Sequence, residues 1–206
     1  MQRLTPAQID ATSLAAGFEP RAVRAVLQVE CGGTGYAPNG WLLIQFEPSW
    51  FRRQLPPVIT ARIKQAVAAE AAKKELTEAE VALLKDWRTT QANGVEGQLR
   101  ERMAFDAACR IDKRAALLST SWGLPQMMGF NHRACGFATV EDMVEAFRQS
   151  EANQLAGMLR FIKSKPALAA ALKAKDWGVL AYHYNGPAYK QFNYDRRLAT
   201  AYSTLS

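Results

Sequence analysis

A single β-hairpin signal stands in a chain whose other segments are patterned as helices, and this contrast limits the fold more than any other feature. The dipeptide Asn39-Gly40 favours the positive φ values of a type I′ turn, and the run "WLLIQF" (41–46) that follows fits a strand. No repeat or low-complexity linker divides the 206 residues. We therefore expect one domain over residues 1–206, of the α+β class and predominantly α-helical, with one small hairpin near the N-terminal third.

Helix start and stop signals place the remaining elements. The sequence "TPAQ" (5–8) combines an N-cap threonine, proline at the first helical position and glutamine at the third, and Gly17 supplies a stop. A second helix starts at Glu19-Pro20 and ends at Gly32-Gly33. Further helices are expected at 60–74, 77–90, 97–118, 140–164 and about 195–205, with a short helix flanked by turns inside 121–131.

The net charge of +7 indicates an acidic partner or surface but does not select one. Lys and Arg number 26 against 19 Asp and Glu. Nucleic acid, an anionic membrane and an acidic bacterial cell wall all fit this charge. No nucleic-acid-binding pattern of basic residues with interleaved aromatics stands out, so nucleic acid is not the expected partner.

Three cysteines and two histidines give no metal-ligand pattern. Cys31, Cys109 and Cys135 contain no CxxC pair, and His132 and His183 have no partner at ligand spacing. We expect no metal, no cofactor and no disulfide framework. The first 20 residues lack the continuous apolar stretch of a signal peptide, and no later stretch approaches the roughly 18 apolar residues that span a bilayer. We therefore expect the protein to stay initially in a cytoplasm, without stable membrane insertion.

Glu30 is the first candidate for chemistry. It falls in the last turn of an apolar helix, where the negative end of the helix dipole and burial against Val26 and Val29 both disfavour a charged carboxylate. Both effects are expected to raise the pKa of Glu30, as a general acid working near neutral pH requires. The alternative is an exposed glutamate that only decorates a helix end.

Glu47 is the second candidate, because it follows the predicted strand and precedes Pro48. If the hairpin folds back over the end of the second helix, Glu30 and Glu47 face one cleft, which is the arrangement of paired carboxylates that glycoside hydrolysis uses. The alternative for Glu47 is a surface ion pair with Arg52 or Arg53.

Three blocks of the sequence together resemble a known family. They are "VLQVECGGTGYAPNGWLLIQFEPSWF", "STSWGLPQMMGFNH" and "YHYNGPAYKQFNYDRRLATAY", in this order and over most of the chain. They are similar to the N-acetylmuramidase domain of endolysins from phages of Gram-negative bacteria, a branch of the lysozyme-like superfamily. Glu30 matches the family's catalytic acid, with Cys31 where serine is more usual. Glu47 matches the acid of a "FE-R-H" stretch, although Pro48 and Ser49 replace the arginine and histidine.

The resemblance implies substrate-binding roles for four further residues. The middle block is also similar to the "S-x-G-x-x-Q" segment of lytic transglycosylases and goose-type lysozymes, which implies that Ser121 and Gln126 line the sugar cleft. Gln126 offers a donor and an acceptor to N-acetyl and hydroxyl groups. The "YN" of the third block implies that Tyr184 and Asn185 close the same cleft, with the Tyr184 hydroxyl near the acid.

The expected function is cleavage of the β-1,4 bond between N-acetylmuramic acid and N-acetylglucosamine in peptidoglycan glycan strands, with Glu30 as general acid. We expect a monomer that waits in the host cytoplasm until the inner membrane is permeabilised. A lytic transglycosylase, which forms anhydro ends with one acid, is the first alternative. A non-catalytic basic module that binds cell wall or nucleic acid is the second.

Overall fold

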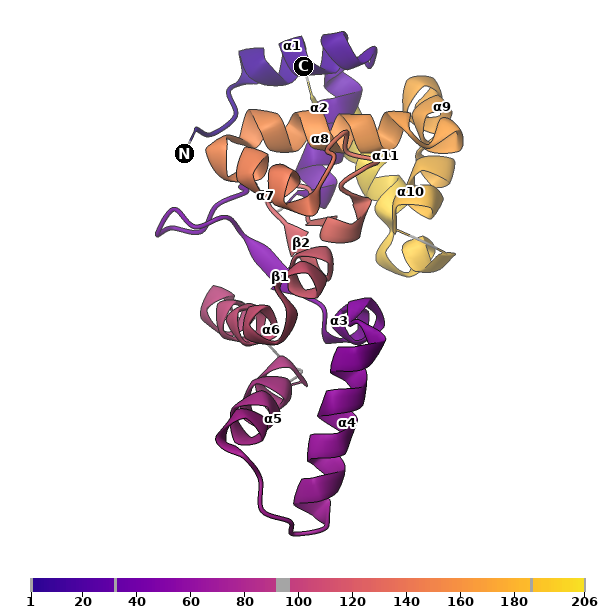
Figure 1. Ribbon diagram of the computed structural model, residues 1–206. Coiled ribbons are helices and arrows are strands. Elements are labelled where there is room, and N and C mark those ends of the chain that lie inside the picture. Colours follow the sequence, from indigo (N-terminus) through magenta and orange to yellow (C-terminus); the bar gives the residue numbers. More distant parts are fainter. Residues whose placement is uncertain (1, 32, 92–96, 186, 206) are drawn as a thin grey trace. The chain divides into compact units, whose positions relative to one another are not determined.

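The computed structural model describes residues 2–31, 33–91, 97–185 and 187–205, and the side chains of residues 185 and 188 lie outside its description (Figure 1). The described chain is mostly helical with one small antiparallel sheet, which confirms the predicted fold class. The α-helices are α1 (Pro6–Ala16), α2 (Pro20–Glu30), α3 (Pro48–Gln54), α4 (Pro57–Ala71), α5 (Glu78–Gln91), α6 (Gln98–Leu118), α7 (Val140–Gln149), α8 (Glu151–Lys163), α9 (Pro166–Ala174), α10 (Trp177–Asn185) and α11 (Tyr194–Thr204). The strands are β1 (Ile44–Phe46), β2 (Thr120–Trp122) and β3 (Met127–Met128), in the sheet order β1-β2-β3, and two 3-10 turns cover Gly129–Asn131 and Pro187–Phe192.

The predicted hairpin forms, but its turn differs from the prediction. Tyr36 and Leu42 make an antiparallel bridge, and the Gly40 N–H donates to the Ala37 carbonyl at 2.8 Å, so the turn spans 37–40. Within this turn, Gly40 has positive φ (84°) and Asn39 does not. A type I′ turn needs positive φ at both residues, so the type I′ prediction for Asn39-Gly40 is wrong. The physical reason is Pro38, whose ring fixes the negative φ of the first central turn position.

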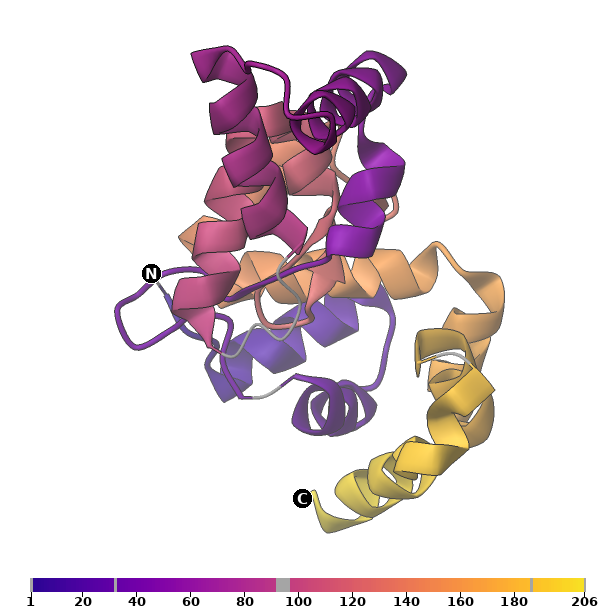
Figure 2. The same ribbon diagram turned by 90° about the horizontal axis from the view of Figure 1, so that it is seen from below.

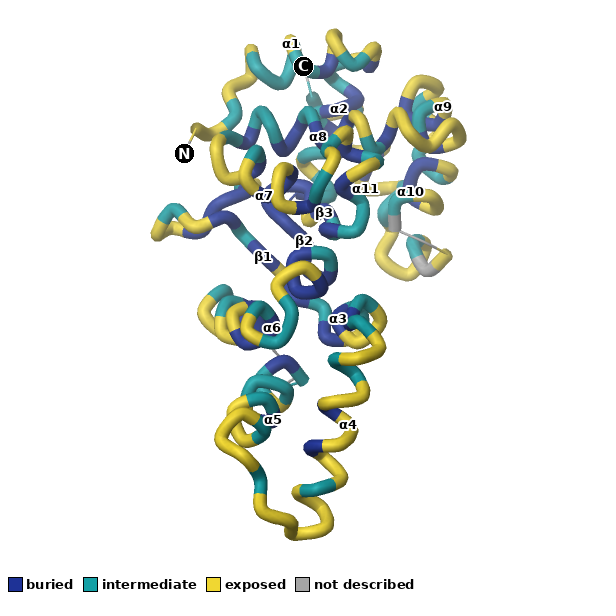
Figure 3. The backbone as a smooth tube through the Cα atoms, in the orientation of Figure 1, coloured by how far each residue is buried: buried dark blue, intermediate teal, exposed yellow. Residues whose placement is uncertain are grey.

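The structure has two compact units. Unit 1 comprises Met1–Leu43, Trp122–Met127 and Asn131–Ser206. Its core joins apolar side chains from α2, α8, α9, α10 and α11, and the buried stretches of α2 and α8 are dark blue in Figure 3. Helix α8 packs against α1, α7 and α9, and α11 packs against α2 and α10. The C-terminal helix therefore braces the helix that carries Glu30.

Unit 2 comprises Ile44–Ser121 and Met128–Phe130. Helix α6 packs against α3, α5 and β1, and α4 packs against α5 (Figure 2). Asp112 leaves helical φ and ψ inside α6, and its carboxylate accepts the Ala115 N–H at 2.7 Å, which caps the last part of the helix across this kink. Helix α4 buries Ile63 and Ala66 and exposes most of its other side chains (Figure 3).

Two predicted helices differ from the structure, each for its own reason. The helix predicted at 140–164 is α7 and α8, separated by Ser150 in an extended conformation (φ −159°, ψ 153°). The Ser150 hydroxyl caps α8 by accepting the Asn153 N–H at 3.2 Å. The segment 121–131 contains a short 3-10 helix only at its end, Gly129–Asn131. The rest forms the end of β2, a turn and β3, because Gly123 (φ 67°) and Gln126 (φ 46°) are left-handed and Pro125 lacks an N–H.

Within the described residues, no helix is both long enough and apolar enough to cross a membrane.

Candidate functional site

Glu30 is the last residue of α2, and it is half-buried. It follows Val26 by four residues and Val23 by seven, so it lies on the helix stripe whose other members are core residues. The helix ends there because Cys31 is extended, while its N–H still donates to the Leu27 carbonyl at 3.1 Å. The alternative of a fully exposed glutamate at a helix end does not fit this burial.

Tyr184 packs against the core cluster that includes Cys31, and its hydroxyl lies within electrostatic range of Glu30 and Cys31. The ring of Tyr184 is half-buried, but its oxygen is fully buried and has no hydrogen-bond partner among the described residues. Burial, followed by the nearby charges of Cys31 and Glu30, raises the pKa of Tyr184 well above its usual value of 10.0. Tyr184 therefore presents a neutral hydroxyl to the end of α2, from a helix on the other side of the core.

The two buried cysteines of unit 1, Cys31 and Cys135, are unreactive thiols. Cys31, Cys109 and Cys135 are all free. Burial is the main cause that raises the pKa of Cys31 and of Cys135 to about 12. Because the thiolate is the nucleophile and the metal ligand, these residues act as small apolar side chains.

Two side chains of α8 hold the loop that follows Glu30. One carboxylate oxygen of Glu151 accepts the Gly35 N–H at 2.7 Å and the Thr34 hydroxyl at 3.0 Å, and the other accepts the Leu4 N–H at 2.8 Å. A Cβ on Gly35 would lie 2.0 Å from the Gln154 Oε1 atom. The backbone at Gly35 therefore approaches α8 more closely than any other residue type allows.

Gln154 fixes a second loop, which carries Gln126. Its Oε1 accepts the Leu124 N–H at 2.6 Å, and a Cβ on Gly123 would lie 2.6 Å from the same atom. The Gln126 side chain is exposed, and its Nε2 donates to the Gly123 carbonyl at 2.8 Å. Gln126 has a positive φ (46°), which is uncommon for a residue other than glycine, and its N–H donates to the Gly123 carbonyl at 3.1 Å within this turn. Gln126 is thus a fixed, exposed amide at the surface of unit 1.

Glu47 is a half-buried carboxylate in unit 2. It is the N-cap residue of α3, yet its side chain makes no capping hydrogen bond, and its N–H donates to the Ser119 carbonyl at 3.0 Å. Burial raises the pKa of Glu47 above its usual value of 4.5. Among the described residues it forms no ion pair with Arg52, which contacts Gln91, or with Arg53, whose guanidinium lies 5.0 Å from the Trp50 ring centroid.

Glu101 is a carboxylate near Glu47 that the sequence prediction missed. It is 8% exposed, and its Oε2 accepts the Phe46 N–H at 2.7 Å. Burial raises the pKa of Glu101, and the neighbouring charge of Glu47 raises it further. The same part of unit 2 contains Ser121, which is buried and donates to the Gln45 carbonyl at 3.3 Å. This bond ties β2 to β1, and a contact of Ser121 with substrate stays a prediction.

The missed polar residues share a recognisable pattern. Glu101 precedes buried Ala104, Phe105 and Ala108 by three, four and seven positions, so it lies on the apolar stripe of its helix. Glu151 precedes Gln154, Leu155 and Met158 by the same spacings. A polar residue at a stripe position was therefore the signal that the sequence offered.

Other predicted site residues are placed only in part. The side chain of Asn185 lies outside the described residues, so its predicted role is not tested. Glu30, Tyr184 and Gln126 belong to unit 1, whereas Glu47 and Ser121 belong to unit 2, and the pairing of Glu30 with Glu47 across one cleft stays a prediction. In the described segments, no group of three or more His, Cys, Asp and Glu side chains is arranged to hold a metal ion.

Comparison with known proteins identifies a family and similar solved structures. The family model described as "Muramidase: N-acetylmuramidase" matches residues 19–206. Among solved structures, the chain is similar to the endolysin of Burkholderia AP3 phage, with 31% sequence identity and a TM-score of 0.78. This match covers 98% of the present chain and 71% of the phage protein. No curated protein matches the chain.

Proposed function

The chain belongs to the N-acetylmuramidase family of glycoside hydrolases, and from this premise we propose that it is a peptidoglycan-degrading endolysin with Glu30 as its general acid. The bond cleaved is the β-1,4 link between N-acetylmuramic acid and N-acetylglucosamine. The observation that carries the assignment of Glu30 is its position: a half-buried carboxylate at the end of a core helix, within electrostatic range of the buried hydroxyl of Tyr184.

In the proposed reaction Glu30 gives its proton to the glycosidic oxygen as the bond from this oxygen to C1 of the muramoyl ring breaks. The released N-acetylglucosamine end keeps that proton as a hydroxyl hydrogen. Water then adds to C1, and a second carboxylate takes the proton that the water loses. The cycle therefore consumes one water and returns Glu30 to its protonated form once protons redistribute.

Glu47 is our candidate for the second carboxylate. Its support is local: it is half-buried, free of a capping hydrogen bond and outside the described ion pairs. Glu101 beside it accepts a backbone N–H, so Glu101 has a structural task that Glu47 lacks. A base must be deprotonated when it acts, and the burial that raises the pKa of Glu47 shifts its working range towards neutral pH.

A lytic transglycosylase is the second candidate function. It is favoured by the exposed amide of Gln126 and the buried hydroxyl of Tyr184, because their motifs resemble those of lytic transglycosylases. In that reaction the 6-hydroxyl of the muramoyl ring attacks C1, so no water is consumed and one acid is enough. Mass spectrometry of the released muropeptides separates the two reactions. Reducing muramoyl ends support the hydrolase, and 1,6-anhydro ends contradict it.

The decisive variants are Glu30→Gln and Glu47→Gln, compared with Glu145→Gln on the exposed face of α7. We expect Glu30→Gln to lower the rate of peptidoglycan cleavage by about 100-fold or more, because a general acid contributes roughly 10² to 10⁴ in rate. Glu145→Gln should keep the wild-type rate. Full activity of a folded Glu30→Gln protein would contradict the assignment of Glu30. Absence of cleavage by the wild-type protein would favour a non-catalytic wall-binding module.

We also propose that residues 1–206 act as one catalytic domain on glycan strands, as a monomer, and that the lysin reaches the periplasmic wall only after the inner membrane is permeabilised. Its family assignment over residues 19–206 and the charge of +7 support this proposal, since the wall is acidic. Fractionation of host cells before lysis tests the location. Recovery of the protein in the periplasm of cells with intact membranes would contradict it.

A further inference from the structure

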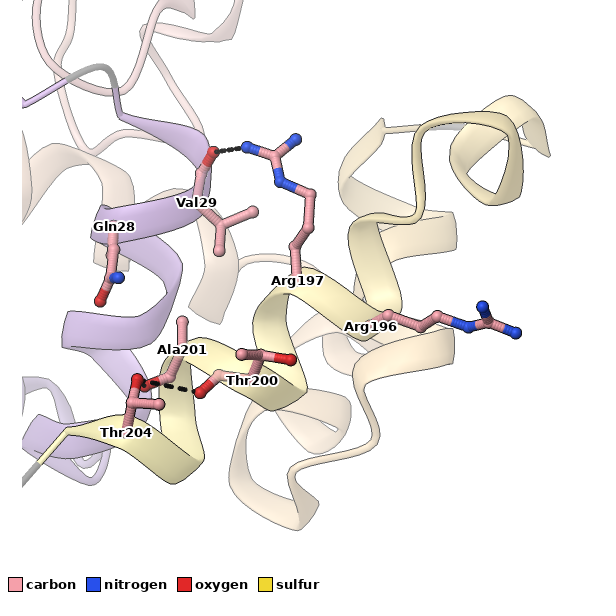
Figure 4. Close-up of a pocket in the computed structure, with 7 residues that line it drawn as sticks. All are labelled: Gln28, Val29, Arg196, Arg197, Thr200, Ala201 and Thr204. Carbon is pink, nitrogen blue, oxygen red and sulfur yellow. Dashed lines mark hydrogen bonds between the residues drawn. The ribbon is translucent and has the colours of Figure 1, made fainter.

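A pocket of about 390 Å³ lies between α2 and α11, directly beside the end of the helix that carries Glu30. Its walls come from the last part of α2 and from one face of α11 (Figure 4). The lining residues are Gln28, Val29, Arg196, Arg197, Thr200, Ala201 and Thr204. All belong to unit 1, and the two helices pack against each other, so the pocket is built from one packed core.

The polar groups of this pocket suit an anion. The Arg197 guanidinium turns towards α2 and donates to the Val29 carbonyl at 3.3 Å, whereas Arg196 extends away from α2 (Figure 4). No carboxylate lines the pocket. Among the described residues, neither the Arg196 guanidinium nor the Gln28 amide forms a hydrogen bond or an ion pair. A guanidinium beside amide and hydroxyl groups favours a planar oxyanion such as a carboxylate, and Arg196 adds positive charge at the edge of the pocket.

The position of Arg197 links the pocket to the candidate acid. The carbonyl that it contacts belongs to Val29, the residue directly before Glu30. This carbonyl is one of the last four in α2, which have no partner inside the helix. The part of the pocket at Val29 therefore lies within about one residue's length of the Glu30 backbone.

We propose that the pocket between α2 and α11 binds the peptide stem of the muramoyl residue that is being cleaved, through a free carboxylate of the stem. This inference rests on the proposed function. The stem leaves the muramoyl ring from the lactyl group on C3, close to the C1 atom whose bond Glu30 protonates. Its D-glutamate and terminal residues supply carboxylates. The pocket thus gives the enzyme a way to prefer stem-bearing strands over bare glycan.

The test compares two substrates with one set of variants. Purified peptidoglycan is used intact, and after an N-acetylmuramoyl-L-alanine amidase has removed its stems. The variants are Arg196→Ala and Arg196→Ala/Arg197→Ala, and the charge-matched controls are Lys64→Ala and Lys163→Ala, on exposed positions of α4 and α8. The measured quantity is the ratio of kcat/KM on stem-bearing strands to kcat/KM on stem-free strands.

We expect the double variant to lower this ratio by about tenfold at low salt, and by less at high salt, because exposed charges are screened. The controls should keep the wild-type ratio. Equal losses on both substrates would overturn the proposal, because they would mean that Arg197 only caps α2. An unchanged ratio would overturn the proposal as well. If the ratio is unchanged and the double variant loses binding to anionic vesicles or DNA, the pocket is assigned to another polyanion.

A binding measurement separates this proposal from the assignment of Glu30. Free stem tetrapeptide is titrated into the Glu30→Gln protein and followed by NMR, with and without the double arginine change. Binding that disappears with the two arginines supports the pocket whatever the activity of Glu30→Gln. Absence of binding in the parent protein, or binding that survives the arginine changes, contradicts it.

Discussion

Gln154 is the residue whose replacement should most clearly test how the loops of unit 1 are held. It is fully buried on α8, and its amide serves two backbone groups. Its Oε1 accepts the Leu124 N–H at 2.6 Å, and its Nε2 donates to the Phe147 carbonyl at 2.7 Å. Gln154→Leu keeps the approximate volume but removes both hydrogen bonds.

The expected cost follows from what each backbone group keeps. The Leu124 N–H is buried and loses the acceptor described for it, which costs about 1–3 kcal/mol. The Phe147 carbonyl keeps the Tyr36 hydroxyl as a donor at 3.0 Å, so its loss is nearer to one ordinary hydrogen bond, about 1 kcal/mol. The added apolar contacts of leucine offset part of this. We expect a net loss of about 2–4 kcal/mol in the free energy of unfolding.

Urea denaturation followed by circular dichroism measures this loss, and Gln149→Leu is the matched control. Gln149 is exposed on α7, so its replacement should change stability by less than about 0.5 kcal/mol. A Gln154→Glu variant keeps an acceptor for Leu124 but puts a buried charge against the Phe147 carbonyl, so it should be destabilised at neutral pH and recover in acid. If Gln154→Leu unfolds at the same urea concentration as Gln149→Leu, the anchoring role of Gln154 is wrong.

Three further outcomes are expected. Thr139→Ala should lower stability by about 1 kcal/mol in urea denaturation, because the Thr139 hydroxyl accepts the Asp142 N–H in a capping box. Burial raises the pKa of Glu101 above 4.5. Between about pH 4.5 and the raised pKa, the folded state therefore binds more protons than the unfolded state, and the free energy of unfolding falls as pH rises through this window. Glu101→Gln, which keeps an acceptor for the Phe46 N–H, should therefore melt higher than wild type at neutral pH and lose this advantage below about pH 4.5; equal melting curves at all pH values would refute it. Tyr184→Phe should keep or raise stability, by up to about 1 kcal/mol, because it removes a buried hydroxyl without a described partner, while it lowers the rate of peptidoglycan cleavage; an unchanged rate would contradict a role for this hydroxyl.

Local signals in the sequence predicted the elements where they acted alone. The capping box at Thr5 and the left-handed Gly17 give α1 the predicted bounds, 6–16. Prediction failed where a contact distant in sequence decides the conformation. Ser150 is extended because Gln2 pairs with it and accepts the Glu151 N–H at 3.0 Å, and nothing in the periodic pattern of 140–164 records that contact. The helical spacing there continues across the break because both helices bury the same core.

The candidate site divides in the same way. Glu30 could be found from its own helix, because a carboxylate at a stripe position before two glycines is a local pattern. The position of the Tyr184 hydroxyl was implied only by the family resemblance and by no local pattern, because α10 is placed by packing against α9 and α11. Glu151 and Gln154 were missed for a related reason. A buried polar residue looks like an error in an apolar stripe until the loops that it binds are known.

These buried polar groups explain why an acid can be kept at the end of α2. A carboxylate at a helix C-terminus is disfavoured by the helix dipole, and Gly33 and Gly35 after it bring no side chains that could hold the backbone there. Without an external anchor that segment would be free to move, and the acid with it. Helix α8 supplies the anchor, because the Glu151 carboxylate accepts charge-assisted hydrogen bonds from the Gly35 N–H and the Thr34 hydroxyl. The placement of Glu30 therefore depends on α8, more than a hundred residues later in the chain. Glu151→Gln should lower both the free energy of unfolding and the rate of peptidoglycan cleavage, whereas Glu30→Gln should lower the rate of cleavage alone.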